Sequence, residues 1–297
     1  MLKVYRNGNE ELGVKPASQS FLSKLFYVTR IALDYAVQVE VIDNNIMRSL
    51  DLGKPKAIKE SKQIKGYSKE EIQSMYNAFE KQSILWEQLK ESERYRRPVI
   101  DLYLAFNLML FTGMRSEEVR ALFWRDVDFQ EGILSINKAM SLSYKIDKLK
   151  ISEAGAKLGK TKNLGSVRDI SINDQMLNLF EQVRKYNLKR GISCKEDDLI
   201  FQSDRYKEAW TGNGFSKSLN DVLKFCGCEI RLAPHRLRHT CATIMEIQKA
   251  NDHEIMTQLG LTQYSTVRVY TDRGKGIQRN NSNLIDKGIL EEFGIEL

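Results

Sequence analysis

The feature that most constrains the fold is an apolar segment at residues 98–111, with hydrophobic side chains on nearly every side of a helical projection. Its apolar members include Val99, Ile100, Leu102, Phe106, Leu108 and Met109. A helix that is hydrophobic all round is typical of the centre of a domain. The segment is shorter than the roughly 20 apolar residues that a membrane span needs. We therefore expect a buried central helix with other elements packed around it.

Length and composition bound the class of protein. A chain of 297 residues corresponds to two domains at roughly 150 residues per domain. With 42% hydrophobic and 29% charged residues, the chain is predicted to fold as a globular protein rather than to be disordered. The net charge of +7 fits a polyanionic partner, and it equally fits a protein without one.

The sequence excludes several other classes of protein. The N-terminal residues lack the apolar stretch of a secretory signal. Four cysteines are too few for a disulfide scaffold in a chain of this length, which favours a reducing, cytoplasmic setting. Neither of the glycine-rich phosphate-binding motifs, G-x-x-x-x-G-K-[ST] and G-x-G-x-x-G, occurs. No nucleotide cofactor is therefore predicted.

Residues 1–65 are predicted to form a small helical unit followed by a linker. Between Ser18 and Glu40, apolar residues recur at helical spacing. Residues 51–65 contain Gly53, Pro55 and a run of lysines, which indicates an extended basic linker. A unit of about 50 ordered residues is marginal as an independent domain. Residues 66–297 are assigned to the second domain.

A helix-start signal opens the second domain. Ser68 and Glu71 have the spacing of a capping box, and Tyr67 and Ile72 are placed to form a hydrophobic staple. Helical spacing predicts helices over residues 69–89, 98–111, 116–122, 174–188, 215–225, 234–249 and 252–259, and a short piece that carries Tyr270.

Two further signals concern helix ends and the tail. Gly113 is expected to end the central helix, and Ser116 to cap the next one. The tail, residues 280–297, also has helical spacing. It is predicted to pack either on its own domain or on a neighbouring copy.

Short strands interrupt the helices of the second domain. Residues 127–129 and 133–136 flank a Glu131-Gly132 turn and are predicted to form a hairpin, and residues 167–172 alternate as a third strand. A basic hairpin is expected at residues 159–162. The predicted fold class is α+β, mainly α-helical: a helical domain with a small antiparallel sheet, preceded by a small, partial helical domain.

Three separated segments carry residues suited to chemistry: residues 112–119, residues 234–240 and residues 259–271. Arg115 follows the expected helix end at Gly113 and precedes a helix start. Its guanidinium would lie near free backbone N–H groups, where a phosphate binds well. The plainer interpretation pairs Arg115 with Glu118, three residues later.

The second segment places three cationic or titratable side chains in the first turns of a helix opened by Pro234. His235 shares a helix face with Arg238 and with His239. Zinc binding by this His-x3-His pair, together with the Cys226-x-Cys228 pair, is an alternative. It is disfavoured because Cys-x-Cys is tighter than zinc sites usually have, and because an arginine lies between the histidines.

Tyr270 alone would be an ordinary core tyrosine. With two arginines, a lysine and a histidine around it, a phenol becomes a candidate nucleophile. The cations would bind an anion that gains charge as it reacts, and a phosphodiester attacked in line is such an anion.

These segments, in this order, resemble the tyrosine recombinases, or phage-type integrases. The family motif T-G-x-R-x-x-E fits residues 112–118 in full, and H-x-L-R-H-T fits residues 235–240 in full. Leu259-Gly260 begins the third motif, L-G-H-S, and Tyr270 lies nine residues after Leu261. The resemblance covers roughly residues 64–273, and residues 30–45 look like the end of the family's core-binding domain. Each motif alone is modest, but all three in order are specific.

The resemblance implies a role for each site residue. Tyr270 would attack a DNA phosphodiester and leave a 3′-phosphotyrosine and a free 5′-hydroxyl. Arg115 and Arg238 would bind the non-bridging oxygens. Lys160 would donate a proton to the leaving 5′-oxygen, with Lys162 as the alternative lysine.

The remaining roles support the nucleophile and the arginines. His235 would help to remove the proton of Tyr270, whose ordinary pKa is about 10. Glu118 would steady the arginines. Because a covalent intermediate keeps the energy of the ester bond, rejoining needs neither ATP nor a metal, and no cofactor is predicted.

Two departures from the family pattern affect these expectations. The third motif normally holds His or Trp, whereas this chain has Leu261, which offers packing but no hydrogen bond. The first 65 residues hold only the latter half of a core-binding domain. Leu261 predicts slower cleavage or a catalytically impaired DNA-binding protein. The short N-terminal unit predicts either a truncated chain or a reduced grip on DNA.

Basic segments flank the candidate site. Residues 138–169 hold eight basic residues against three acidic ones. The predicted DNA contacts are Lys54, Lys56, Lys59, Lys62, Lys65 and Arg168. Solvated loops are the plainer interpretation.

The resemblance also implies partners. Double-stranded DNA carrying recombination sites would be the substrate, bound by a homotetramer. Without DNA, the protein could be a monomer. Accessory directionality factors would be further partners. A type IB topoisomerase-like relaxing enzyme is a third hypothesis, which shares the phosphotyrosine chemistry but acts without pairing two sites.

Overall fold

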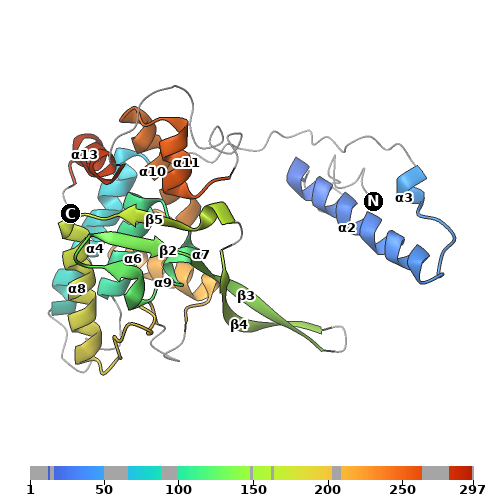
Figure 1. Ribbon diagram of the computed structural model, residues 1–297, viewed down its shortest axis with the longest axis horizontal. Helices are drawn as coiled ribbons and strands as arrows, with labels where there is room; N and C mark the ends of the chain where they lie inside the picture. Colours follow the sequence, from blue (N-terminus) through green and yellow to red (C-terminus); the bar gives the residue numbers. More distant parts are fainter. Residues whose placement is uncertain are drawn as a thin grey trace. The chain divides into compact units, whose positions relative to one another are not determined.

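The chain divides into two units, residues 1–64 and 65–297 (Figure 1). The computed structural model describes residues 13, 17–49, 66–87, 99–147, 150–161, 164–202, 209–262 and 281–295. Within these ranges, no helix is long and apolar enough to cross a membrane.

In the N-terminal unit, a short helix is hydrogen-bonded to one long helix. Helix α2 (Gln19–Gln38) is capped by Ser18, whose Oγ accepts the N–H of Phe21 at 3.3 Å. Helix α3 (Ile46–Ser49) is held to α2 through Asp34, whose Oδ1 accepts from Arg48 Nε and from Asn45 Nδ2, each at 2.7 Å. The predicted helix at residues 18–40 agrees with α2.

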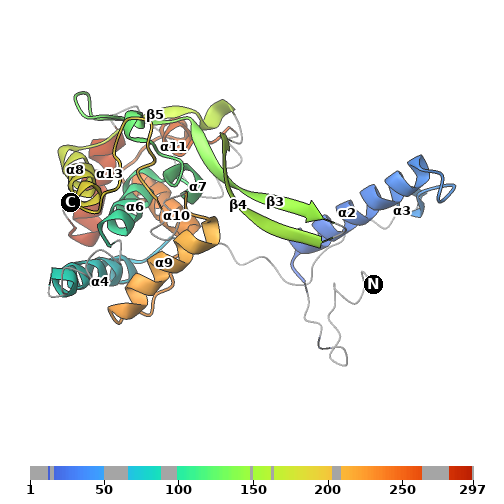
Figure 2. The same cartoon turned by 90° about the horizontal axis from the view of Figure 1, so that it is seen from below.

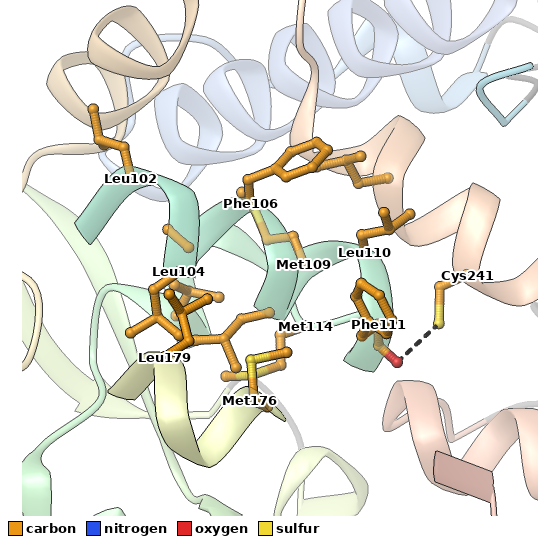
Figure 3. Close-up of a cluster of buried hydrophobic side chains, with 14 of the residues drawn as sticks. Leu102, Leu104, Phe106, Met109, Leu110, Phe111, Met114, Met176, Leu179 and Cys241 are labelled. Atoms are coloured by element: carbon orange, nitrogen blue, oxygen red, sulfur yellow. Dashed lines mark hydrogen bonds between the residues drawn. The ribbon is translucent and has the colours of Figure 1, made fainter. Parts of the chain in front are cut away.

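Helix α6 (Val99–Thr112) forms the centre of the second unit, as its all-round apolar pattern predicts. Figure 3 shows its side chains among those of α8 (Asp174–Lys189) and α10 (Pro234–Ile247). Phe106, Leu108 and Met109 are fully buried. Cys241 of α10 lies 3.9 Å from the carbonyl oxygen of Phe111. Burial of this kind stabilises the fold by roughly 1.5–3 kcal/mol per large apolar side chain.

The predicted capping box opens α4 (Lys69–Glu87). The Ser68 N–H donates to Glu71 Oε2 at 2.8 Å, and the Glu71 N–H donates to Ser68 Oγ at 3.3 Å. The helix packs on α6 through aromatic rings, with the centroids of Phe79 and Phe106 separated by 5.1 Å.

Further helices of the described residues complete this unit. They are α7 (Ser116–Val119), α9 (Gly212–Phe225), α11 (Asp252–Leu259) and α13 (Asn281–Phe293). Helices α7, α9 and α13 pack on α6, and α11 packs on α10 and on residues 168–171. Helix α13 packs on α10, α4 and α6 of its own unit and buries Ile285, Ile289 and Phe293. Packing on its own domain, one of the two predicted positions of the tail, is therefore observed for α13.

A three-stranded antiparallel sheet adjoins the helices, in the order β1 (Val127–Asp128), β2 (Ile133–Ile136) and β5 (Arg168–Ser171). Leu134 of β2 faces Ile170 of β5. Both side chains are buried. All three strands agree with the predicted ones.

A second pair of strands, β3 (Lys138–Asp147) and β4 (Lys150–Lys160), forms a long hairpin that runs out beyond the helices of the unit (Figure 2). The hairpin predicted at residues 159–162 is present but is much longer than predicted: Gly159 and Lys160 end its second strand, β4, where they pair with Ala139 and Lys138. The alternating apolar residues of 140–146, separated by serine and lysine, were the signal for this hairpin. Arg120 anchors it, because its Nη2 donates to the carbonyl oxygen of Met140 at 3.0 Å.

Candidate active site

The first motif lies where α6 ends and α7 begins. Gly113 has φ +65°, a left-handed conformation that ends α6. Arg115 is extended and forms the N-cap of α7, so the prediction that Ser116 caps this helix is wrong: Ser116 is its first residue. The Arg115 N–H donates to Glu118 Oε2 at 3.0 Å, which ties the cap to the third helical position.

Glu118 binds two arginines. Its Oε1 accepts from Arg115 Nη1 at 2.7 Å, and its Oε2 accepts from Arg168 Nη2 at 3.0 Å. Only 2% of the Glu118 side chain is exposed, against 30% for Arg115. The plainer interpretation of Arg115, a pair with Glu118, is confirmed. The pair does not cover the guanidinium of Arg115, which stays open to a ligand.

Arg168 does not lie where a DNA contact needs it. Its side chain is 4% exposed. Its Nε donates to the Gln258 carbonyl oxygen at 2.9 Å, and its Nη1 donates to the Ser166 carbonyl oxygen at 3.0 Å. The structure corrects the prediction that Arg168 contacts the DNA backbone. A signal was available, since Arg168 and Ile170 are two apart in a strand and share its buried face.

Arg238 of the second motif is also buried, with 1% of the residue exposed. Its Nη1 donates to the Gly113 carbonyl oxygen at 2.7 Å, and its Nη2 donates to the Leu259 carbonyl oxygen at 2.5 Å. These oxygens lie at the C-terminal ends of α6 and α11, where the helix dipole favours a cation. Arg238 thus joins the first and third motifs.

The two histidines of the second motif differ in exposure. His235, in the first turn of α10, is exposed, whereas His239 is buried. Burial, with added effects from His235 and Arg238, lowers the pKa of His239 to about 4. Of the two residues predicted to share a helix face, His235 is therefore accessible to solvent and Arg238 is enclosed.

The zinc alternative finds no support in the described part of the chain, where no three His, Cys, Asp or Glu side chains are grouped to hold a metal. Cys228 instead lies 3.5 Å from Ser74 Oγ of α4. Cys226 and Cys228 are both buried.

The third motif ends α11. Gly260 has φ +60°, and Leu261 after it is 8% exposed and belongs to the hydrophobic core. Ser166 Oγ donates to the Gly260 carbonyl oxygen at 3.4 Å. Gln258 Nε2 donates to the Thr112 carbonyl oxygen at 3.3 Å, which places the end of α11 beside the first motif.

Lys160 is exposed at the end of β4, opposite Lys138. Several predicted site residues lie outside the described residues: Tyr270, Lys162, Lys54, Lys56, Lys59, Lys62 and Lys65. The structure thus brings Arg115, Glu118 and Arg238 together, adds Arg168 to them, and places Lys160 at the base of the hairpin.

The local chemistry suits a phosphate that gains charge. One accessible guanidinium and one enclosed guanidinium are held by a carboxylate and by helix-end carbonyl oxygens, so neither must reorganise when an anion arrives. The charges of Arg115, Glu118, Arg168 and Arg238 sum to a net positive value, which favours a polyanion at this point of the surface.

Comparison with known proteins decides the family. Residues 68–276, which include all three motifs, match the Phage integrase family. The chain belongs to this family. The predicted tyrosine recombinase family and enzyme class, site-specific recombinase, are confirmed. The integrase of Staphylococcus phage L54a is 26% identical over 264 residues, which cover 86% of this chain and 71% of that protein.

Solved structures confirm the fold of this integrase-family chain. The Tn1549 transposon integrase in complex with a circular intermediate DNA has a TM-score of 0.60 at 16% identity, covering 92% of this chain and 80% of that one. The XerH recombinase bound to its difH substrate has a TM-score of 0.56 at 20% identity, covering 92% and 65%. A lambda integrase dimer bound to a COC′ core site has a TM-score of 0.53 at 16% identity, covering 93% and 66%.

Proposed function

We propose that this recombinase cuts and rejoins double-stranded DNA at specific sites through a 3′-phosphotyrosine formed by Tyr270. The observation that carries the proposal is the meeting of three motifs far apart in sequence. Arg238 binds the carbonyl oxygens of Gly113 and Leu259, and Arg115 lies two residues beyond Gly113. This meeting supports a site at which Tyr270, which follows the third motif, reaches the same phosphate as Arg115.

The proposed roles combine the resemblance to the family with the positions of the described side chains. Arg115, partly exposed and fixed by Glu118, binds a non-bridging oxygen of the phosphodiester. Arg238, enclosed beside Gly113 and Leu259, adds positive charge at a place where low dielectric strengthens its effect on an anion. Lys160 protonates the leaving 5′-oxygen, with Lys162 as the alternative.

His235 accepts the proton of the attacking phenol, and its exposure on the first turn of α10 leaves it accessible to do so. The energy of the broken ester bond is kept in the phosphotyrosine. Rejoining by the 5′-hydroxyl then needs neither ATP nor a metal ion.

The same chemistry defines the partners. Four strand cuts require a homotetramer on two DNA sites. A chain that is monomeric without DNA can assemble into this tetramer on its sites. Directionality factors are further partners. The lysines predicted to contact DNA, Lys54, Lys56, Lys59, Lys62 and Lys65, bind the backbone without reading its sequence. The proposed setting is the cytoplasm of a bacterial or phage-infected cell, and the similarity to a phage integrase supports it.

A suicide substrate tests the proposal. Duplexes that bind the protein would be selected from a random pool and nicked at successive positions, so that cleavage beside a nick traps the covalent adduct. We expect an adduct with the wild-type chain, and none with Tyr270→Phe at unchanged DNA affinity. An adduct that persists in Tyr270→Phe would overturn the assignment of the nucleophile.

The buried Leu261 favours a second candidate, a DNA-binding member of the fold with impaired cleavage. Leucine supplies packing at a position where the family has a hydrogen-bond donor. Sequence-specific binding with no adduct from any nicked duplex would select this candidate. Relaxation of supercoiled DNA without site preference would select the topoisomerase-like alternative.

A further inference from the structure

The guanidinium of Arg168 lies at a junction of four segments, outside the roles assigned above. It contacts Glu118 of α7, the Gln258 carbonyl oxygen of α11 and the Ser166 carbonyl oxygen, while Arg168 itself belongs to β5. Each of its three nitrogens donates one of these bonds. A cation as enclosed as this one requires such partners, because an unpaired buried charge is strongly destabilising.

The first consequence concerns charge. Arg115 and Glu118 alone would form a neutral pair, and a neutral pair attracts a phosphate weakly. With Arg168 on the second carboxylate oxygen, the three side chains together carry a charge of +1. Burial raises the pKa of the Glu118 carboxyl, but Arg168 and Arg115 outweigh it, and the net pKa lies below its usual value. Glu118 thus stays ionised and keeps both arginines bound.

The second consequence concerns the end of α11. A Cβ atom on Gly260 would lie 2.7 Å from Arg168 Nη1, so the guanidinium sits directly against this turn. A Cβ on Gly165, three residues before Arg168, would lie 2.5 Å from Thr262 Cγ2. The strand that carries Arg168 and the end of α11 are therefore in close contact, and the chain continues from there to Tyr270.

We propose that Arg168 is a positioning residue for strand transfer: it offsets the charge of Glu118, so that Arg115 presents net positive charge to the phosphodiester, and it fixes the end of α11. This inference rests on the proposed function. Arg168 acts through Glu118 and through the backbone, and it touches no reacting atom. A merely structural arginine would affect stability alone, whereas this role also sets the rate of cleavage.

The test compares cleavage by charge variants on the nicked duplex. Arg168→Met removes the charge and keeps an apolar stem. We expect adduct formation at saturating DNA to slow by about 10- to 100-fold, the loss typical when a side chain that holds a metal ligand in place is removed. DNA affinity should change by less than about 3-fold, because many other cations bind the backbone. The double variant Glu118→Gln/Arg168→Met restores the net charge of +1 and should recover at least about 5-fold in rate.

A matched control separates charge from stability. Arg190 of the α8 C-cap is a second buried arginine, 3.9 Å from the buried Asp101, and it lies on no motif. Arg190→Met should lower thermal stability and leave the rate of adduct formation unchanged below the melting temperature. Should Arg168→Met fail to fold, Arg168→Lys keeps the charge and is compared with Arg168→Gln, which lacks it.

The outcomes distinguish two failures. No adduct from the wild-type chain would overturn the proposed function, and this inference with it. An adduct that forms at the wild-type rate in folded Arg168→Met would overturn this inference alone. A double variant that is no faster than the single one would also overturn it, since charge compensation would then have no effect.

Discussion

At Arg115, one guanidinium meets two demands: it must be fixed, and it must remain accessible. The ion pair with Glu118 fixes it, and the exposed fraction of 30% leaves it accessible. We expect Arg115→Ala to slow adduct formation by at least about 100-fold, the typical cost of removing a donor to a developing oxyanion. DNA affinity, measured by gel shift, should fall by less than about 3-fold.

Arg125 provides the control for this substitution. It is an exposed arginine paired with Asp197 on the surface, and it belongs to none of the three motifs. Arg125→Ala should change neither the rate of adduct formation nor the affinity. Equal losses of binding and cleavage in Arg115→Ala would contradict a role in the transition state.

His239 makes the stability of the second unit depend on pH. Its pKa is about 6.5 in an unfolded chain and about 4 when folded. The unfolded state therefore binds more protons between these values, and stability that is complete above pH 6.5 is lost as the pH falls toward 4. Asp101 acts in the opposite direction, because burial raises its pKa to about 7.

A variant isolates the contribution of His239, since Asp101 is common to both proteins. We expect the free energy of unfolding of the wild type, relative to His239→Gln, to fall by about 2 kcal/mol between pH 7.5 and pH 5. Urea unfolding at the two pH values measures the difference. A difference that stays constant with pH would show that His239 titrates alike in both states.

At the scale of elements, the close approach of α6 and α11 depends on Gly113. A Cβ at this position would lie 2.3 Å from Leu259 Cδ2, and φ is +65°. We expect Gly113→Ala to lower the free energy of unfolding by about 2–4 kcal/mol, through backbone strain and overlap together. Chemical denaturation provides the measurement.

Gly191, after α8, separates the two effects. Its φ is +69°, but a Cβ there would have no atom within 4 Å. Gly191→Ala should therefore cost only the backbone strain, about 1–2 kcal/mol. If both substitutions lowered the free energy of unfolding by the same amount, the end of α11 would have to move aside for a methyl group without a measurable loss of stability.

Local patterns predicted most elements because the physics that forms them is local. The capping box at Ser68, the all-round apolar α6 and the alternation in β5 act within a few residues. The β3–β4 hairpin extends far beyond the predicted residues 159–162, because serine and lysine between its apolar residues make the segment resemble a charged loop.

The site was predicted less completely, for a physical reason. The motifs identified Arg115 and Arg238, but not that Arg238 is enclosed by helix-end carbonyl oxygens. Charge alone predicts a surface position for Arg168, because its partner Glu118 is 50 residues away in sequence. Only the folded chain brings such partners together.

At the scale of the whole molecule, the second unit depends on a short segment at its start. The Tyr67 N–H donates to Thr240 Oγ1 at 2.7 Å, and its hydroxyl donates to the Arg231 carbonyl oxygen at 2.9 Å. The Arg236 guanidinium lies 3.8 Å from the centre of the Tyr67 ring. Residues 66–68 therefore hold the start of α10, the helix that carries His235 and Arg238.

Two fragments test this dependence. A fragment of residues 65–297 should fold cooperatively, because its core is complete within the unit. A fragment of residues 69–297 should lose about 3–5 kcal/mol, the cost of removing a buried aromatic side chain with its contacts. Tyr67→Ala in the full chain should show a similar loss. Equal stability of the two fragments would mean that residues 66–68 are dispensable.

The bonds that join the motifs span long stretches of sequence: Gly113 to Arg238 covers 125 residues, and Thr112 to Gln258 covers 146. A ribosome adds residues from the N-terminus at about 5–20 per second. Arg115 is therefore made many seconds before the end of α11, which packs beside the first motif in the folded unit. These bonds can form only as the last fifth of the chain is made, so an unfinished polypeptide carries Arg115 without the partners from α10 and α11 that meet the first motif in the folded unit.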